Sequence, residues 1–312
     1  MKISYFFIAL VLLQSVAFGS GSSGGSGGSG GAAGGSHPKL ESGTLSKLQL
    51  AQEKKILELR EKNKSLNQET FDQKHTALTQ ILSSSVKLIR NGQASEVDYE
   101  GLDQKKLSSY LKSLSSMTRT EYNQMTRNQK LAFLINTYNA FTITLIVKNP
   151  NIKSIKDLGS FISSPWKKKF IPLFGSQLSL DEVEHGLIRQ DPLFQEPRIH
   201  FAVNCASVGC PALLNEAFTG DQLENQLQLV TDNFLKDRTR NRIEGNNVVI
   251  SKIFDWYAVD FEKGWLDIGS VQDFLAKNSK SLADDNNQKL ILESKNYKLK
   301  YSDYDWKLNK TQ

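Results

Sequence analysis

The apolar positions of this 312-residue chain follow helical spacing over several segments. Residues 131–147 are apolar on nearly every side, which predicts a buried helix. Ser179 and Glu182 form the Ser-x-x-Glu pattern of a capping box, and the apolar residues that follow them lie on one helical stripe. Thr219 and Gln222 predict a second capping box, which is followed by another apolar stripe. These segments predict a chain that is rich in helix.

Strand composition occurs in shorter segments. Residues 198–205 and 248–251 are strand candidates, and residues 297–301 alternate apolar residues with lysines as a half-exposed edge strand does. Helices cluster before residue 160, and strands do not alternate with helices as parallel βαβ units require. We therefore predict an α+β fold, with a helical N-terminal half packed against a small, mainly antiparallel sheet.

The beginning of the chain predicts an export signal and a tether. Lys2 precedes an apolar stretch over residues 5–18, and Ala17 and Gly19 have the small-residue spacing that a signal peptidase needs. Residues 20–36 contain only Gly, Ser and Ala, a composition typical of a flexible coil. The predicted organisation is a signal peptide (1–19), a flexible linker (20–36), a helical N-terminal region (37–110) and an α+β domain (111–312).

Composition narrows the class of protein. The net charge of +6 is a mild excess among 39 basic and 33 acidic residues, so we expect no nucleic-acid partner. A multi-pass membrane protein is excluded, and we expect membrane contact only through the signal segment before its cleavage. Export predicts a periplasmic or extracellular protein, where disulfides can form. Two cysteines exclude a disulfide-dense scaffold and a four-cysteine metal site.

Two pairs of polar residues lie within the predicted helices. Asn136 and Asn139 share one helix face, and they either hold neighbouring backbone or orient a catalytic group, since an unpaired buried amide costs about 1–3 kcal/mol. Glu184 falls inside the apolar stripe of the later helix, His185 at its edge, and Arg189 points away. Because a carboxylate facing the core must be paired, Glu184 is either a structural anchor or an active-site acid.

The candidate nucleophile lies at the end of the strand predicted over 198–205. In a regular strand His200 and Cys205 face opposite sides, but the rule can break at the strand end. There Cys205 is placed to act as a nucleophile, with loop amides as an oxyanion site. Its four-residue separation from Cys210 leaves open a disulfide, one catalytic thiolate or inert buried thiols. A metal site that adds His185 and His200 is disfavoured because no short CxxC or HxxxH spacing is present, and we expect no metal and no cofactor.

Several motifs together resemble a bacterial and plant family, the "domain of unknown function 547". They occur in the order found in that family and cover roughly residues 120–310, whereas residues 37–110 lie outside the resemblance. The motifs are Leu-Ile-Asn136-Thr-Tyr-Asn139-Ala, Ser179-Leu-Asp-Glu-Val-Glu184-His185-Gly-Leu-Ile-Arg189, Pro197-Arg-Ile-His200-Phe-Ala-Val-Asn-Cys205-Ala-Ser-Val-Gly-Cys210-Pro, Ser251-Lys-Ile-Phe-Asp-Trp-Tyr257 with Asp260-Phe261, and Tyr304-Asp-Trp306-Lys-Leu-Asn309.

The family is in turn similar, more distantly, to papain-like and transglutaminase-like cysteine hydrolases. This implies a thiolate that works with a histidine base and a polar third residue. The resemblance favours Cys205 as the nucleophile, because a serine replaces the second cysteine in the plant version of the motif. It favours His185 as the base with His200 as the alternative, oriented by Glu184 or Asn139. The histidines precede Cys205, the reverse of the papain order, so a triad would require a rearranged topology.

Two functions follow as hypotheses. The first is an exported cysteine hydrolase or acyl-transfer enzyme that acts on peptide or amide bonds in the cell envelope. The second is a non-catalytic envelope binding module with a structural Cys205–Cys210 disulfide and a contact surface formed by the aromatic residues of 253–261 and lysines 167–169. A histidine nitrogen within about 4 Å of the Cys205 sulfur would favour the enzyme. Bonded sulfurs would favour the module.

Overall fold

A computed structural model describes residues 71–160 and 163–311, together with 50–51, 54–55 and 57–58. The signal peptide and linker expected over residues 1–36 lie outside the described residues, as does most of the region before residue 71. The described residues belong to one compact unit within Glu41–Gln312.

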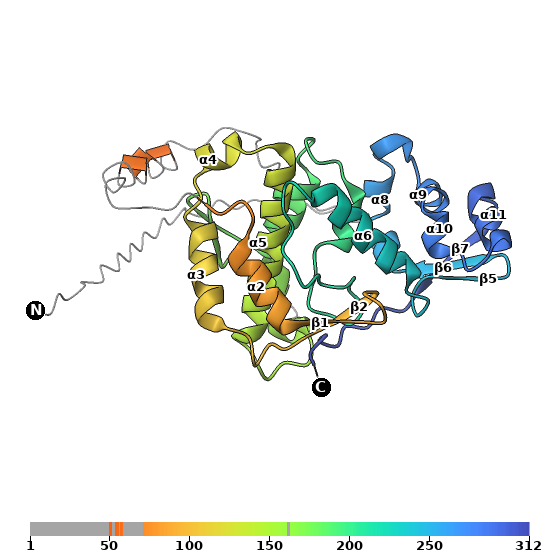
Figure 1. The fold of residues 1–312 in the computed structure, drawn as a ribbon, viewed down its shortest axis with the longest axis horizontal. Helices are drawn as coiled ribbons and strands as arrows, with labels where there is room; N and C mark the ends of the chain where they lie inside the picture. The colour runs from red at the N-terminus through yellow and green to blue at the C-terminus, as the bar shows by residue number, and fades with distance from the viewer. Residues whose placement is uncertain (1–49, 52–53, 56, 59–70, 161–162, 312) are drawn as a thin grey trace, which may run out of the picture. The chain divides into compact units, whose positions relative to one another are not determined.

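A buried helix organises the first half of the described chain (Figure 1). Helix α5 (Arg127–Val147) begins at a capping box formed by Thr126 and Gln129, and it is buried almost from end to end, as its sequence predicts. It is long and apolar enough to cross a membrane, but 89% of its apolar window is buried inside the protein, which is typical of a core helix. The surrounding helices are α2 (Thr76–Ser85), α3 (Gln104–Ser115) and α4 (Arg119–Gln124), with α2 against α3 and α3 against α5.

The strands form three small sheets in the described part of the chain. Two are antiparallel hairpins, β1 (Val86–Ile89) with β2 (Ala94–Val97) and β3 (Ile171–Leu173) with β4 (Ser176–Leu178). The third has the order β5 (Arg242–Glu244), β6 (Asn247–Ser251), β7 (Lys298–Ser302), with β5–β6 antiparallel and β6–β7 parallel. The α+β class and the strands at 248–251 and 297–301 are confirmed. The single sheet that the sequence predicted is instead divided into three.

Most of the remaining elements are short, and the longest of them is helix α6. Four are single turns of 3₁₀ helix, namely η1 (Ile155–Leu158), η2 (Pro165–Lys167), η4 (Pro197–Phe201) and η5 (Trp265–Asp267). The α-helices of the second half are α6 (Leu223–Lys236), α7 (Ile253–Trp256), α8 (Ala258–Phe261), α9 (Val271–Lys277), α10 (Ser279–Leu282) and α11 (Asn286–Ser294). Helices α9, α10 and α11 pack together beside the β5–β6–β7 sheet (Figure 1).

The prediction of a strand over residues 198–205 is wrong. Its first half is the 3₁₀ helix η4, which starts at Pro197 and is capped by the side chain of Glu196. The amides of Ala202 and Val203 bond to the carbonyl of Ile199, so local bonds take the place of a strand ladder. All five residues of η4 are buried, and burial on every side gives an apolar composition that does not distinguish a strand from a helical turn.

Two other expectations need correction. The helix after Ser179 does have its capping box, with both reciprocal bonds to Glu182, but it continues as a π-helix, η3 (Glu182–Arg189). Such turns are rare and occur often at functional sites. The second capping box does not form, because the amide of Gln222 bonds to the backbone carbonyl of Thr219, and α6 then starts without a side-chain cap.

Candidate active site

A cavity of about 240 Å³ lies where the motif segments meet. Helix η3 packs against α5 and η4 packs against α6, which brings the buried polar residues of η3 and η4 to one place. The C-terminal segment after β7 and the residues around α7 close the other sides. The lining residues are Tyr138, Ser164, Trp166, Asp181, Glu184, His185, His200, Val203, Cys205, Cys210, Pro211, Ile253, Trp256, Tyr257, Tyr304 and Trp306.

His200 is held by an aspartate that the sequence analysis did not select as a site residue. Its Nε2 atom lies 2.7 Å from Oδ2 of Asp260, and its ring stacks on Tyr257 with 3.8 Å between ring centroids. Burial lowers the pKa of His200, although Asp260 and Glu184 oppose the shift. The imidazole is therefore neutral near pH 7. In that state Nε2–H donates to the carboxylate, and Nδ1 is left as the basic nitrogen. This Nδ1 atom is buried and has no hydrogen-bond partner among the residues that the structure describes.

Asp260 is a buried carboxylate that binds two cations as well as the ring of His200. Lys263 lies 2.6 Å from Oδ1, and Nε of Arg189 bonds to Oδ2, which also bonds to His200. Burial alone would raise the pKa of Asp260, but the hydrogen bonds from His200, Arg189 and Lys263 hold it well below its usual range. Arg189, which the helical stripe predicted to point away, instead turns toward Asp260 because that buried charge needs a partner.

His185 has a different environment from His200. Its side chain is 32% exposed, its Nδ1 lies 2.6 Å from Nη1 of Arg189, and its Nε2 lies 3.7 Å from Asp181. The edge position predicted for His185 is confirmed. Because no buried carboxylate fixes its ring, the geometry favours His200 over His185 as a base.

Glu184 is buried and faces the cavity. It is 5% exposed, and its Oε1 atom has no hydrogen-bond partner. Burial raises the pKa of the hydroxyls of Tyr138 and Tyr257 above the usual range, and the negative charge of Glu184 and the hydrogen bond that each hydroxyl forms with it add to both shifts. Glu184 is therefore the buried carboxylate that the helical stripe predicted, surrounded by tyrosines and without an ion pair in the described part of the chain.

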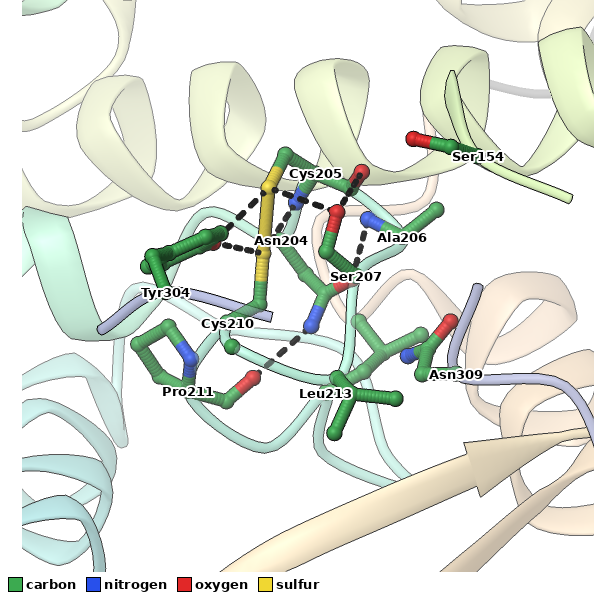
Figure 2. Close-up of a disulfide and its surroundings, with 12 residues drawn as sticks. Ser154, Asn204, Cys205, Ala206, Ser207, Cys210, Pro211, Leu213, Tyr304 and Asn309 are labelled. Atoms are coloured by element: carbon green, nitrogen blue, oxygen red, sulfur yellow. Dashed lines mark hydrogen bonds between the residues drawn. A yellow bond between two sulfur atoms is a disulfide. The ribbon is translucent and has the colours of Figure 1, made fainter. Parts of the chain in front are cut away.

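Cys205 and Cys210 form a disulfide at the wall of the cavity (Figure 2). The sequence left open a disulfide, one catalytic thiolate or inert buried thiols, and the structure has the disulfide. The hydroxyl of Tyr304 lies 3.2 Å from the sulfur of Cys205 and 3.1 Å from that of Cys210. The amide of Cys205 also donates to the sulfur of Cys210. No hydrogen bond joins Cys205 to a histidine among the residues described, although both histidines line the same cavity.

The loop between the cysteines is fixed by bonds on both sides. Arg240 donates to the carbonyls of Val208, Gly209 and Cys210. The amides of Val208 and Gly209 donate to carbonyls of the C-terminal segment, and the amide of Ala206 donates to Asn204. These amides already have acceptors, so the oxyanion site expected from the loop backbone is not available at these positions in the disulfide form.

The two asparagines of α5 hold backbone rather than a catalytic group. Asn139 donates to the carbonyl of Ala202 and accepts from the amide of Asn204, and Asn136 makes the same pair of bonds to Phe218. Each amide thus donates one hydrogen bond to backbone and accepts one from it, and within the described part of the chain Asn139 has no hydrogen bond to either histidine. Its contribution is to position the chain just before Cys205.

The family comparison agrees with the motifs. Residues 122–235 match the model of the family described as "Protein of unknown function, DUF547". The resemblance to DUF547 is confirmed over this segment. No curated protein and no solved structure matches the chain, so the likeness to papain-like hydrolases stays a prediction.

The cavity draws on residues inside and outside the DUF547 segment. Glu184, His200 and Cys205 lie within it, whereas Tyr304 comes later in the chain, as does Asp260, which bonds to His200 behind the cavity lining. Asp260 stood in an aromatic–acidic motif for which core packing was the favoured explanation, and only the fold shows its bond to His200. No group of three or more potential metal ligands lies together in the residues that the structure describes.

Proposed function

We propose that the protein is an exported thiol enzyme that cleaves or transfers acyl groups at peptide or amide bonds of the cell envelope, with Cys205 as its nucleophile. One observation supports this most: Cys205 lines the same cavity as His200, whose second nitrogen is fixed by Asp260. A nucleophile, a neutral base and a carboxylate that orients the base are the parts that thiol acyl transfer needs.

His200 is the proposed base. Asp260 accepts the Nε2 proton, so the buried Nδ1 atom can accept the proton of a thiol. Asp260 acts as a positioning residue because it contacts only the far nitrogen of the ring. This replaces His185 as the first choice and adds Asp260 to the site.

The disulfide is the resting form in this proposal. A dithiol first reduces it, giving up two electrons and two protons and becoming a disulfide itself, while Cys205 and Cys210 become thiols. Cys205 then passes its proton to His200 and attacks the carbonyl carbon of the substrate. The C–N bond breaks, the amine leaves with that proton, and water hydrolyses the thioester to regenerate the thiol. An oxidising compartment after export would keep the enzyme in the disulfide form until such a dithiol is supplied.

The test is thiol labelling of the full chain with and without dithiothreitol. Iodoacetamide labelling is followed from about pH 5 to about pH 9, and the labelled cysteine is mapped. After reduction we expect Cys205 to react fastest, with an apparent pKa below the free value of about 8.5. His200→Gln should return that pKa to the free value, whereas the matched change His185→Gln should not. Equal and slow labelling of both reduced cysteines would contradict the proposal.

A non-catalytic envelope binding module is the second candidate. The disulfide and the aromatic cavity wall, which includes Trp256 and Trp306, favour it. In that case reduction would leave any ligand affinity unchanged or weaken it, and neither cysteine would show a lowered pKa.

A further inference from the structure

The cavity is lined by a carboxylate that has no cationic partner among the residues described. Glu184 is 5% exposed, the hydroxyls of Tyr138 and Tyr257 form hydrogen bonds with its carboxylate, and its Oε1 atom has no hydrogen bond within the described part of the chain. Buried charged groups are normally paired, because an unpaired one loses its hydration without compensation. Because tyrosine hydroxyls carry no charge, the partner that this carboxylate lacks is a group that enters the cavity and carries positive charge.

The cationic side chains considered as partners for Glu184 contact other groups. Arg189 pairs with Asp260 and contacts Nδ1 of His185, and Lys263 also pairs with Asp260. Lys156 places its ammonium 3.7 Å from the ring centroid of Trp306. Among the residues described, none of these cations forms an ion pair with Glu184.

The walls around Glu184 suit a cation. Tyr138, Tyr257 and Tyr304 line the cavity together with Trp256 and Trp306. Aromatic faces attract ammonium groups, most strongly where water is excluded. The contact between Lys156 and Trp306 shows that one of these rings already accepts a lysine ammonium. The volume of about 240 Å³ suits a single side chain rather than a drug-sized ligand.

We propose that the cavity binds an alkylammonium group, with the carboxylate of Glu184 as its acceptor and the aromatic side chains as its walls. The ammonium is part of the substrate, so this inference deepens the proposed function and rests on it for the identity of the bound molecule as a substrate. Binding itself needs neither free thiol nor catalysis. The chemistry fits the side chain of lysine or a related diamino acid, and equally the free α-ammonium of a peptide.

The first experiment measures binding to the full chain in its disulfide form. Three of the four tryptophans in the sequence line the cavity, so their fluorescence reports on its occupant. We expect n-butylammonium to change this fluorescence saturably, and n-butanol, which has the same chain without the charge, to have no comparable effect. Equal binding of the two, or binding of neither, would overturn the proposal.

The variant that tests the acceptor is Glu184→Gln, which keeps the shape and removes the charge. Affinity for n-butylammonium should fall about 10- to 100-fold, as expected for loss of a hydrogen bond to a charged group. Glu182→Gln is the matched control, because Glu182 is on the same turn but pairs with Lys169 and does not line the cavity. It should bind as the unaltered chain does. Unchanged affinity in Glu184→Gln would refute the assignment.

A second variant covers the case in which Glu184→Gln does not fold. Trp256 is 43% exposed, so Trp256→Ala removes one cavity wall at a partly solvated position. Affinity for n-butylammonium should fall several-fold if the wall contributes a cation–π contact. An affinity that does not change would count against the aromatic part of the proposal.

A last comparison separates the sources of the ammonium and the two proposals. Nα-acetyl-lysine amide carries a side-chain ammonium, and glycinamide carries an α-ammonium, so the better ligand identifies the source. With reduced protein, coumarin amides of acetyl-lysine and acetyl-norleucine are then compared. Faster cleavage of the lysine amide supports both proposals. If ammonium compounds bind but no thiol-dependent cleavage occurs, the ammonium site stands and the proposed thiol enzyme is wrong. If cleavage occurs without a preference for the lysine amide, the proposed enzyme stands and the ammonium site is wrong.

Discussion

Two buried histidines, one in the helical region and one at the cavity, differ in the groups that surround their rings. His75 lies in the helical region and is 1% exposed, with Nδ1 2.7 Å from the hydroxyl of Tyr110 and with Phe71 and Phe133 beside its ring. His200 lies at the cavity and is 2% exposed, with Asp260 on one nitrogen and no partner on the other. Burial lowers the pKa of both.

The difference lies in what surrounds each ring. His75 is bonded to a neutral hydroxyl among aromatic rings, a closed arrangement that serves packing. Around His200 lie a carboxylate that binds two cations, a cavity, and a second carboxylate with one oxygen that has no hydrogen-bond partner among the described residues. Unpaired buried atoms cost stability, and two of the five found among the described residues, Nδ1 of His200 and Oε1 of Glu184, belong to residues that line this cavity.

Removing the charge that holds the cavity region together should have the largest effect. Asp260→Ala leaves His200, Arg189 and Lys263 without their shared partner, and we expect the free energy of unfolding to fall by about 3–5 kcal/mol. Urea unfolding measures this change. The matched control is Asp284→Ala, because Asp284 is 57% exposed and pairs only with Arg238 at the surface, and it should cost about 1 kcal/mol or less. Similar losses in the two variants would mean that the Asp260 cluster contributes no more than a surface pair.

Lowering the pH should reduce stability through His75, the buried histidine of the helical region. The pKa of His75 is lowered to about 4 from an unfolded value of 6.5, because burial disfavours its charged form. The unfolded chain therefore binds the proton more readily, so the stability that His75 contributes is present above about pH 6.5 and is lost as the pH falls toward 4.

That shift corresponds to about 3 kcal/mol of unfolding free energy between neutral pH and about pH 4. Unfolding in urea at several pH values measures it, and His75→Gln should remove this part of the pH dependence. The pKa of His200 is also lowered, so its own contribution has the same sign and should remain in the variant. An identical pH dependence in His75→Gln would show that the closed site is not the source.

The sequence predicts the helical region better than the cavity region, and the reason is physical. Helix α5 is specified locally by its apolar run and its cap, so its position follows from residues 126–147 alone. Glu184 is likewise predicted to be buried because the stripe around it is local. By contrast, the bond between His200 and Asp260 joins residues 60 positions apart, and no local pattern specifies it.

The error over 198–205 has the same origin. An apolar segment buried on all sides carries no period that separates a strand from a 3₁₀ turn, and the side chain of Asn139 supplies the bond that a neighbouring strand would otherwise make. The disulfide remained one of several readings because Cys205 and Cys210 could equally have been thiols. The spacing allowed the bond, and the fold of the loop brings the two sulfurs together.

A smaller effect is expected from crowding the loop beside the cavity. A Cβ atom added at Gly209 would lie 2.9 Å from three ring atoms of Tyr304, so Gly209→Ala must displace that ring from the two sulfurs. We expect a loss of about 1–3 kcal/mol, the usual cost of overpacking. Gly269→Ala is the control, because its Cβ would meet only a side-chain atom of Asp273 at 3.7 Å. Thermal unfolding of both variants measures the difference, and equal stability would mean that the Tyr304 ring moves without cost.

The smallest expected effect tests whether the cavity region attracts cations at its rim. Lys156 is exposed, and its ammonium lies 3.7 Å from the ring centroid of Trp306, which lines the cavity. Lys156→Met keeps much of the side-chain length and removes the charge, so the free energy of unfolding should fall by about 0.5–1 kcal/mol, as for an exposed cation–π pair. Lys153→Met, three residues earlier and also exposed, is the control and should be neutral. If Lys156→Met is neutral as well, the Trp306 face does not favour an ammonium, and the cation preference of the cavity must then rest on Glu184 alone.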